Sequence, residues 1–284
     1  MGGMSPPTTA QASAIAAYRA LHASGCFVLP NPWDAGSAVY LQRLGFRALA
    51  STSAGFAFSR GLPDDVGAVP RDAMLGHLRE LAAATPLPVN ADFQNAYAHE
   101  PEGVAESVAL CIATGVAGLS VEDATGDGAA PLYAPAVAVE RVRAARAAID
   151  ASGMPVVLTA RCEAWLVGAP DPLRTSLDRL AAYAGAGADC LYAPGVRDPD
   201  EIAQLVRAVA PLPVNVLMSG PVEGLTLARL AELGVRRVSV GSALARAAWG
   251  GFIRAAQGLA EGSFDGLAGA APFGELNDSF RRGS

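Results

Sequence analysis

The sequence predicts an α/β protein built as a (β/α)8 TIM barrel with a C-terminal helical extension. Eight short apolar runs alternate with longer Ala-, Leu- and Arg-rich segments of helical period. The short runs are mainly apolar rather than alternating, which is typical of parallel strands buried on both faces. Eight such units in about 240 residues fit a closed barrel better than an open doubly wound sheet. The first run is not followed by Gly-x-Gly-x-x-Gly, which weakens the dinucleotide-binding alternative.

The predicted strands are short, and three of them begin after Pro in LPV, MPV and LPV segments. Their residues are 26–30, 46–51, 87–92, 117–123, 154–160, 188–194, 212–217 and 235–241.

The predicted helices lie between these strands, and several end in Gly, which readily takes the left-handed cap conformation. Their residues are 9–24, 35–44, 71–84, 101–114, 135–152, 172–186, 198–210, 222–233 and 242–261. The polar, Gly-rich tail 263–284 is expected outside the barrel. Nothing in the composition divides the chain, so residues 1–284 are expected to form one domain. Its barrel would cover about 26–245, with C-terminal helices and tail over 246–284.

The composition predicts a chain with one large core. It has 284 residues, 51% of them hydrophobic, and a mean hydropathy of +0.29. No apolar run approaches the roughly 20 residues that span a bilayer. The first residues, MGGMSPPTTAQ, lack the charged and apolar regions of a secretory signal. We therefore expect a cytoplasmic protein with no membrane partner.

The charged residues exclude several classes of function. The net charge is −6, and the chain contains no Lys. Schiff-base chemistry on an internal lysine and a Walker-type phosphate loop are therefore excluded. The acidic balance and the lack of a basic cluster argue against nucleic acid as a partner.

The four cysteines are scattered without a C-x-x-C pair, which favours buried reduced thiols over zinc or a disulfide framework.

Polar side chains gather where the predicted strands end, which is where barrel enzymes place their active sites. Asp92 and Glu122 end neighbouring strands, so both could face one hard cation such as Mg²⁺. Arg161, on the next strand, offers a fixed fork for a carboxylate or a developing oxyanion. The small residues at 52–55 let backbone N–H groups approach an anion closely. Together these residues suit a small, oxygen-rich, multiply anionic molecule.

Each of these residues also has a purely structural interpretation. Asp92 could be a helix cap or part of a barrel ion pair, and Arg161 could simply neutralise Glu122. Asp123 is expected to be a structural partner or cap rather than a ligand. Trp33 fits core and pocket wall about equally. The joint occurrence at adjacent strand ends carries the functional interpretation.

These strand ends resemble the isocitrate lyase / phosphoenolpyruvate mutase superfamily over about residues 26–245. The matching blocks are NPWDAGSA (31–38), GFRALASTSAGFA (45–57), GLPD (61–64), PVNAD (88–92), GLSVED (118–123), TARCEA (159–164) and PVNVL (213–217).

The resemblance implies a Mg²⁺-dependent barrel, with Mn²⁺ as a second option, that binds 2-oxo or enol carboxylates. Members make or break a C–C or P–C bond through an enolate-like species. It also implies a homo-oligomer, a tetramer, with the C-terminal helices packed on a neighbour. The residues carried over by position are Arg161, Asp64 and Glu122 as catalytic groups; Trp33, Thr52, Ser53, Ala54, Arg161 and Asn215 as substrate contacts; and Asp92, Glu122, Asn90 and Asp64 as metal ligands.

Three positions depart from the family pattern. Asn90 stands where relatives usually carry the first aspartate of D-x-D. The region 124–135 lacks the K-[KR]-C-G-H loop of the lyase branch, and the strand-6 glutamate is replaced within Tyr192–Gly195. Cys162 follows Arg161 and should point away from it, so it does not substitute for the loop cysteine. These departures argue against isocitrate lyase or methylisocitrate lyase activity.

Three functional hypotheses follow. The first is a Mg²⁺-dependent C–C lyase, decarboxylase or hydrolase acting on oxaloacetate, 2-oxoglutarate or a related 2-oxo acid. The second is a phosphoenolpyruvate mutase or phosphonopyruvate hydrolase. The third, motivated by Asn90 and the altered loop, is a catalytically weak protein that binds 2-oxo acids.

Overall fold

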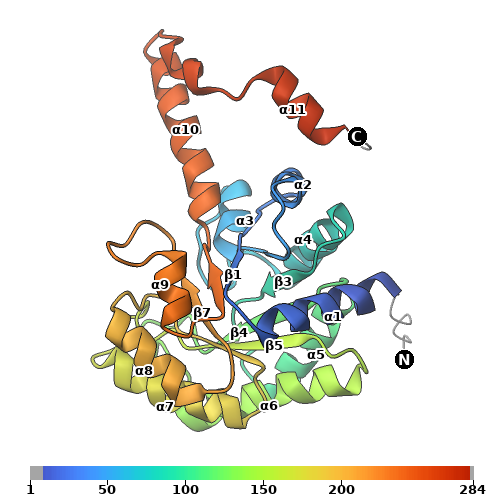
Figure 1. Ribbon diagram of the computed structural model, residues 1–284, viewed down its shortest axis with the longest axis vertical. Helices are drawn as coiled ribbons and strands as arrows, with labels where there is room; N and C mark the ends of the chain where they lie inside the picture. The colour runs from blue at the N-terminus through green and yellow to red at the C-terminus, as the bar shows by residue number, and fades with distance from the viewer. Residues whose placement is uncertain (1–8, 282–284) are drawn as a thin grey trace.

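The computed structural model describes residues 9–281, and within them eight parallel strands form one sheet in the order β1-β8-β7-β6-β5-β4-β3-β2. Helices alternate with the strands around this sheet (Figure 1). The strands are β1 (Phe27–Leu29), β2 (Leu49–Ala50), β3 (Val89–Asp92), β4 (Gly118–Glu122), β5 (Val157–Arg161), β6 (Cys190–Tyr192), β7 (Val214–Leu217) and β8 (Arg237–Ser239).

The sheet curls into a nearly closed barrel. Seven neighbouring strand pairs carry parallel registers. The remaining edge lies between β1 and β2, where the Ala50 N–H donates to the Pro30 carbonyl oxygen at 3.0 Å. The Asn31 Nδ2 adds a 2.8 Å bond to the Ser51 carbonyl oxygen at the same edge. The predicted (β/α)8 barrel is therefore confirmed.

Each predicted helix is present, usually one or two residues shorter than expected because helix ends fray. The helices are α1 (Thr9–Ala23), α2 (Ala35–Arg43), α3 (Ser53–Ser59), α4 (Arg71–Ala84), α5 (Pro101–Ile112), α6 (Pro135–Ala151), α7 (Pro172–Gly185), α8 (Pro199–Val209), α9 (Leu227–Glu232), α10 (Ala243–Ala260), the 3₁₀ helix η1 (Asp265–Gly269) and α11 (Phe273–Phe280). The sequence did not predict α3, η1 and α11.

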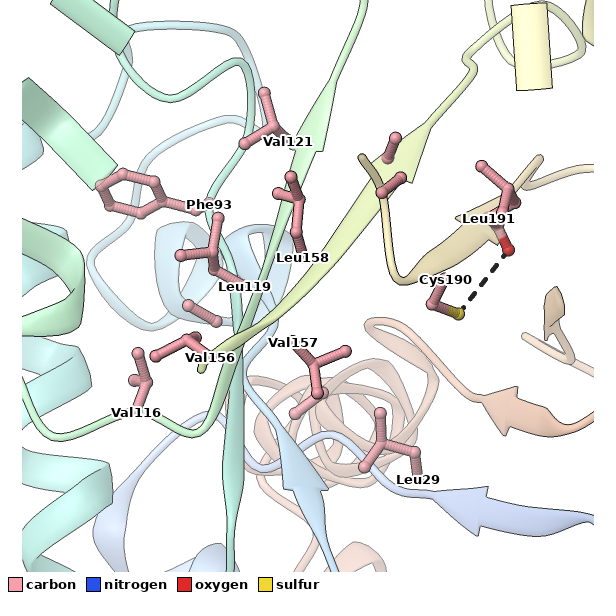
Figure 2. Close-up of a cluster of buried hydrophobic side chains, with 14 of the residues drawn as sticks. Leu29, Phe93, Val116, Leu119, Val121, Val156, Val157, Leu158, Cys190 and Leu191 are labelled. Atoms are coloured by element: carbon pink, nitrogen blue, oxygen red, sulfur yellow. Dashed lines mark hydrogen bonds between the residues drawn. The ribbon is translucent and has the colours of Figure 1, made fainter. Parts of the chain in front are cut away.

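The two faces of the central strands differ in chemistry, because successive side chains of a strand point to opposite sides. Leu119, Val121 and Leu158 belong to the apolar core around the sheet, and Figure 2 shows them on adjacent strands beside Phe93. The intervening residues of β3 to β5 are polar. The strands therefore alternate more than expected, since their polar positions line a cavity inside the barrel.

The C-terminal segment leaves the barrel. Helix α10 projects away from it, and α11 returns toward α2 (Figure 1). Both Nη atoms of Arg43 donate at 2.7 Å to backbone carbonyls of this segment, those of Asp278 and Arg281. The tail lies outside the barrel as expected, with residues 282–284 beyond the described part. Among residues 9–281, no helix is long and apolar enough to cross a membrane.

Candidate active site

A cavity of about 210 Å³ lies at the carboxyl ends of the strands. Most of the predicted site residues line it, contributed by the end of the β2–α3 loop and the start of α3, by the loop between α3 and α4, and by β3, β5 and β7. They are Thr52, Ser53, Ala54, Asp64, Asn90, Asp92, Arg161 and Asn215. The barrel thus brings together residues that are more than 160 positions apart in the chain.

Arg161 is the centre of an ion cluster at the ends of β3, β4 and β5. Its Nη1 lies 3.2 Å from Asp92 Oδ1 and 3.1 Å from Glu122 Oε2. Its other edge holds Glu163 in a bidentate pair, through Nε to Oε1 and Nη2 to Oε2. The guanidinium also lies over the Tyr192 ring, 5.3 Å from its centroid. One cation therefore holds three carboxylates in fixed positions.

The β2–α3 loop holds the same Asp92 from its other side. Both the backbone N–H and the hydroxyl of Ser53 donate to Asp92 Oδ2 at 2.9 Å. Thr52 caps α3 by accepting from the Gly55 N–H at 3.1 Å. A Cβ at Gly55 would lie 2.6 Å from the Thr52 side chain, so the turn requires glycine. The loop is already shaped to bind a carboxylate, which in this structure is Asp92.

The electrostatics of the cluster are dominated by excess negative charge. Burial raises the pKa of Glu122 to about 8 against the opposing charge of Arg161, and Glu163 and Asp92 raise it further. Burial also raises the pKa of Glu163, again opposed by Arg161. Partial burial and the charge of Asp92 raise the pKa of Asp64. A second cation at this point would relieve these repulsions.

The donor set fits a Mg²⁺ ion, which takes oxygen ligands and keeps several waters. Within residues 9–281 no group of three or more His, Cys, Asp or Glu side chains is arranged to hold a metal. Mg²⁺ needs only one or two carboxylates, however, and Asp92, Asp64 and Glu122 interact electrostatically with one another. Asn90 Oδ1 is a buried acceptor without a hydrogen-bond partner. It is the kind of free oxygen that a cation or a metal-bound water would use.

Two predicted site residues do not line the cavity. Glu122 is not among the cavity-lining residues, and it borders the site through its 3.1 Å ion pair with Arg161. Trp33 is half-buried, and its Cβ would lie 3.1 Å from a Cβ at Gly55. The structure thus places Trp33 against the start of α3 rather than on the cavity wall.

The loop after β4 approaches the loop before α4. Gly126 lies so close to Val66 that an added Cβ would be 2.8 Å from the Val66 Cβ. The loop is held internally by an Ala124–Leu132 bridge and by the Thr125 hydroxyl, which donates to the Ala130 carbonyl at 2.6 Å. Its described side chains include neither Cys nor His, in line with the sequence.

Further residues line the cavity that were not predicted as site residues. They are Arg237 and Ser239 of β8, Ser120 of β4 and Arg246 of α10. The signal for Arg237 was present in the segment VRRVS, where alternation places residue 237 inward with Ser239. The pairing of Glu163 with Arg161 was not predicted either.

Asp123 has the structural role expected of it. Its Oδ2 accepts from Tyr183 OH at 2.6 Å and from Arg179 Nη1 at 3.0 Å. Its Oδ1 accepts from the Glu163 N–H at 2.8 Å. Asp123 is buried and therefore fixes the backbone from which Glu163 reaches Arg161.

Barrel enzymes carry their active sites at the carboxyl ends of the strands, which is where this chain carries its arginine-centred carboxylate cluster. A family model described as phosphoenolpyruvate phosphomutase matches residues 18–260. The chain belongs to this family, within the isocitrate lyase / phosphoenolpyruvate mutase superfamily of lyases and mutases that act on 2-oxo acids.

Individual relatives agree with this assignment. An uncharacterised protein of Mycobacterium tuberculosis (strain H37Rv) is 36% identical over 91% of this chain and 94% of its own length. A solved candidate lyase/mutase from Burkholderia cenocepacia J2315 is 50% identical, with a TM-score of 0.91 over 96% of this chain and 97% of its own. Oxaloacetate acetylhydrolase in complex with oxalate is 26% identical, with a TM-score of 0.83 over 94% of each chain.

We predict that Asp123→Asn lowers the free energy of unfolding by about 3 kcal/mol, because it leaves the buried Arg179 without its counter-charge. Urea unfolding followed by circular dichroism measures this change. The matched control is Glu80→Gln on the exposed face of α4, which should change stability by less than about 0.5 kcal/mol. Equal effects of the two substitutions would contradict the structural role of Asp123.

Proposed function

We propose that the chain is a Mg²⁺-dependent enzyme, with Mn²⁺ as a substitute, that cleaves a C–C bond in a small 2-oxo carboxylate such as oxaloacetate or 2-oxoglutarate. The observation that carries the proposal is the arrangement around Asp92. Ser53 and Arg161 both bind the Asp92 carboxylate there. Further carboxylates lie nearby, so that negative charges outnumber positive ones. This arrangement can exchange its internal carboxylate for a substrate when a cation is bound.

The donors around Asp92 would bind the substrate. In the structure, Asp92 accepts hydrogen bonds from the N–H and hydroxyl of Ser53 and from Arg161 Nη1. If Asp92 turns toward a cation, these donors become free for the carboxylate and carbonyl oxygens of a 2-oxo acid. Thr52 and Ala54 border the same subsite, and Asn215 would contact the distal end of the substrate.

Asp92, Glu122 and Asp64 would hold the metal directly or through water, with the Asn90 amide oxygen as a neutral ligand. The bound metal would supply Lewis-acid polarisation of the 2-oxo group. Arg161 keeps a fixed positive charge beside the same oxygen, because Glu163 and Glu122 fix its guanidinium. The negative charge that develops on the carbonyl oxygen is therefore matched by a cation that does not need to reorganise.

The composition of the loop after β4 favours one type of reaction. The described loop 124–135 offers no Cys, His or basic side chain as a proton donor. Decarboxylation of oxaloacetate needs none: the C3–C4 bond breaks, its electrons are taken up by the 2-oxo group, CO₂ leaves, and the enolate takes a proton from water. In hydrolytic cleavage, water supplies OH to the 2-oxo carbon and H to C3 as the C2–C3 bond breaks. Oxaloacetate decarboxylase of Pseudomonas savastanoi, 27% identical over 77% of this chain, supports this direction.

Phosphonate chemistry is the second candidate, favoured by the family model that matches the chain. A phosphonate needs additional cations near its phosphorus. The absence of Lys and of any basic residue in 124–135 argues against it. A protein that only binds 2-oxo acids is disfavoured because the family consists of enzymes.

We also propose a homo-oligomer, a tetramer, located in the cytoplasm. The C-terminal segment exposes an unusual number of large apolar side chains, which favours a protein partner. Phe252 is 60% exposed and Phe273 is 85% exposed, and Trp249, Ile253 and Phe264 accompany them. A second copy of the chain is the simplest partner that would bury these exposed side chains of α10 and the segment after it.

Light scattering coupled to size-exclusion chromatography tests the oligomer. We expect a particle of four chains of 28.8 kDa each. Phe252→Asp should shift the particle toward smaller species, because it introduces a charge into the apolar surface of α10. A wild-type protein that runs as a single chain at micromolar concentration would contradict the proposal.

We predict that Arg161→Met lowers kcat/KM toward the best 2-oxo acid by about 10²- to 10³-fold, because it removes a fixed charge at the developing oxyanion. The screen uses oxaloacetate, 2-oxoglutarate, methylisocitrate and phosphonopyruvate with Mg²⁺ or Mn²⁺. Arg174→Met, at an exposed ion pair on α7, is the matched control and should retain activity.

Phosphate release from phosphonopyruvate alone would favour the second candidate. No turnover and no metal-dependent thermal shift would contradict the enzyme proposal.

A further inference from the structure

A second arginine is buried inside the barrel, away from the carboxylate cluster. Arg237 begins β8, and its side chain is 2% exposed. Its Nε donates to Asn215 Oδ1 at 2.9 Å, and its Nη2 donates to Thr159 Oγ1 at 3.0 Å. Its Nη1 donates to Tyr18 OH at 2.9 Å and lies 3.3 Å from His22 Nε2. The guanidinium is thus held by groups from two strands of the sheet, β5 and β7, and from α1.

None of these partners carries a negative charge. Burial raises the pKa of Tyr18 to about 12, so its phenol stays protonated at neutral pH. Burial and the charge of Arg237 lower the pKa of His22 to about 3, so the imidazole is neutral. Its Nδ1–H donates to the Tyr18 carbonyl oxygen, which leaves Nε2 as the acceptor facing Arg237. The buried cation therefore has no counter-ion among residues 9–281.

Arg161 meets three carboxylates, and Arg179 meets Asp123. Arg141 is also buried without a carboxylate partner among the described residues, but it donates to three backbone carbonyl oxygens and does not line the cavity. A buried charge without a partner is costly, and proteins usually pair it or reserve it for a ligand. Arg237 lines the cavity. Asn90, whose Oδ1 has no hydrogen-bond partner, lines it as well. The missing negative charge can therefore come from a molecule in the cavity.

The hydrogen-bond inventory leaves a donor for such a molecule. A guanidinium has five N–H groups. Four are accounted for by Asn215, Thr159, Tyr18 and His22, which leaves one Nη2–H without a partner in the described chain. Asn215 donates one Nδ2–H to Ser239 Oγ at 2.9 Å and retains another. Because Arg237 fixes its Oδ1, the donor end of the Asn215 amide cannot flip away.

The two arginines lie on different strands and border the same cavity. Arg161 is the last residue of β5, and Arg237 is the first residue of β8. In register, Arg161 pairs with Tyr192, Tyr192 pairs with Asn215, and Asn215 pairs with Arg237. Three strand spacings therefore separate the two arginines, about 14 Å measured along the curved sheet. Both line the cavity of about 210 Å³, which is thus bordered by two separate cations.

We propose that Arg237 is a specificity-determining residue that binds the second acidic group of the substrate, so that the enzyme selects two-carboxylate 2-oxo acids over one-carboxylate ones. This inference rests on the proposed function, in which the first carboxylate and the 2-oxo group lie at Ser53 and Arg161. The second carboxylate accepts from Arg237 and from the oriented amide of Asn215. Its negative charge balances the cation that the fold leaves unpaired.

Matched ligand pairs test the selection without any variant. In the presence of Mg²⁺, calorimetry measures the binding of 2-oxoglutarate against 2-oxopentanoate, and of oxaloacetate against 2-oxobutanoate. The members of each pair have the same chain length and differ in the terminal carboxylate. For at least one pair, wild type should bind the dicarboxylate about tenfold more tightly or better, as expected for a charge-assisted hydrogen bond.

Variants then locate the source of the preference. Arg237→Met should remove the tenfold preference while changing the affinity for the monocarboxylate by less than about twofold. Arg237→Lys keeps the positive charge but loses the planar, bidentate guanidinium, so it should retain part of the preference for the dicarboxylate. Arg161→Met should instead weaken both members of a pair. Circular dichroism establishes that each variant is folded, and a preference left unchanged by Arg237→Lys would refute the role of Arg237 if Arg237→Met does not fold.

The outcomes separate the two proposals. If wild type binds neither member of either pair, the proposed function and this inference both fail. If it binds both members equally, or if Arg237→Met keeps the full preference, the proposed function stands and the role of Arg237 is refuted.

Discussion

The site depends on one interaction, the pairing of Arg161 with three carboxylates at the ends of β3, β4 and β5. Asp92, Glu122 and Glu163 would repel one another without the guanidinium between them. Even with it, the pKa of Glu122 rises to about 8, first through burial and then through its acidic neighbours. The cluster is therefore a strained arrangement that a further cation stabilises. In the proposed function, binding of a metal and orientation of the donors for substrate would be parts of the same event.

The barrel interior shows the cost of this arrangement. Such interiors are usually filled with branched apolar side chains. Here inward positions of the strands carry Asn90, Thr159, Asn215 and Arg237 beside a few apolar side chains such as Leu29 and Leu217. Much apolar packing lies on the outer face of the sheet. The hydrogen bonds of these groups replace packing, while Asn90 Oδ1 remains unsatisfied. Stability thus rests on the outer core, and the inner layer remains free for polar chemistry.

Much of this fold could be predicted from the sequence, because eight apolar runs and the intervening helical periods give an unambiguous alternation. Helix α3 was not predicted because its sequence, SAGFAFS, is short and contains Gly and Ser. Its start also depends on a cap made by Thr52. The tail helices escaped because their stability comes from contacts such as those of Arg43, which are not local.

The site residues at strand ends were the easiest to predict, whereas Arg237, within the barrel, was not predicted. Asp92 and Arg161 follow apolar runs, so their polarity was conspicuous. Arg237 lies inside a strand, and only its inward register shows that it is buried and reaches Asn215. The close approach of Glu163 to Arg161 depends on the bend after β5, which Asp123 fixes. No local sequence pattern encodes that bend.

The central claim is that a cation and a 2-oxo acid take over the partners that Asp92 now has. The most direct test is a crystal structure with Mg²⁺ and oxalate as a 2-oxo acid analogue. We expect an Asp92 oxygen turned toward Mg²⁺, and an oxalate oxygen accepting from the Ser53 N–H and from Arg161. A structure in which Asp92 still accepts from Ser53, with oxalate bound elsewhere or absent, would contradict the account.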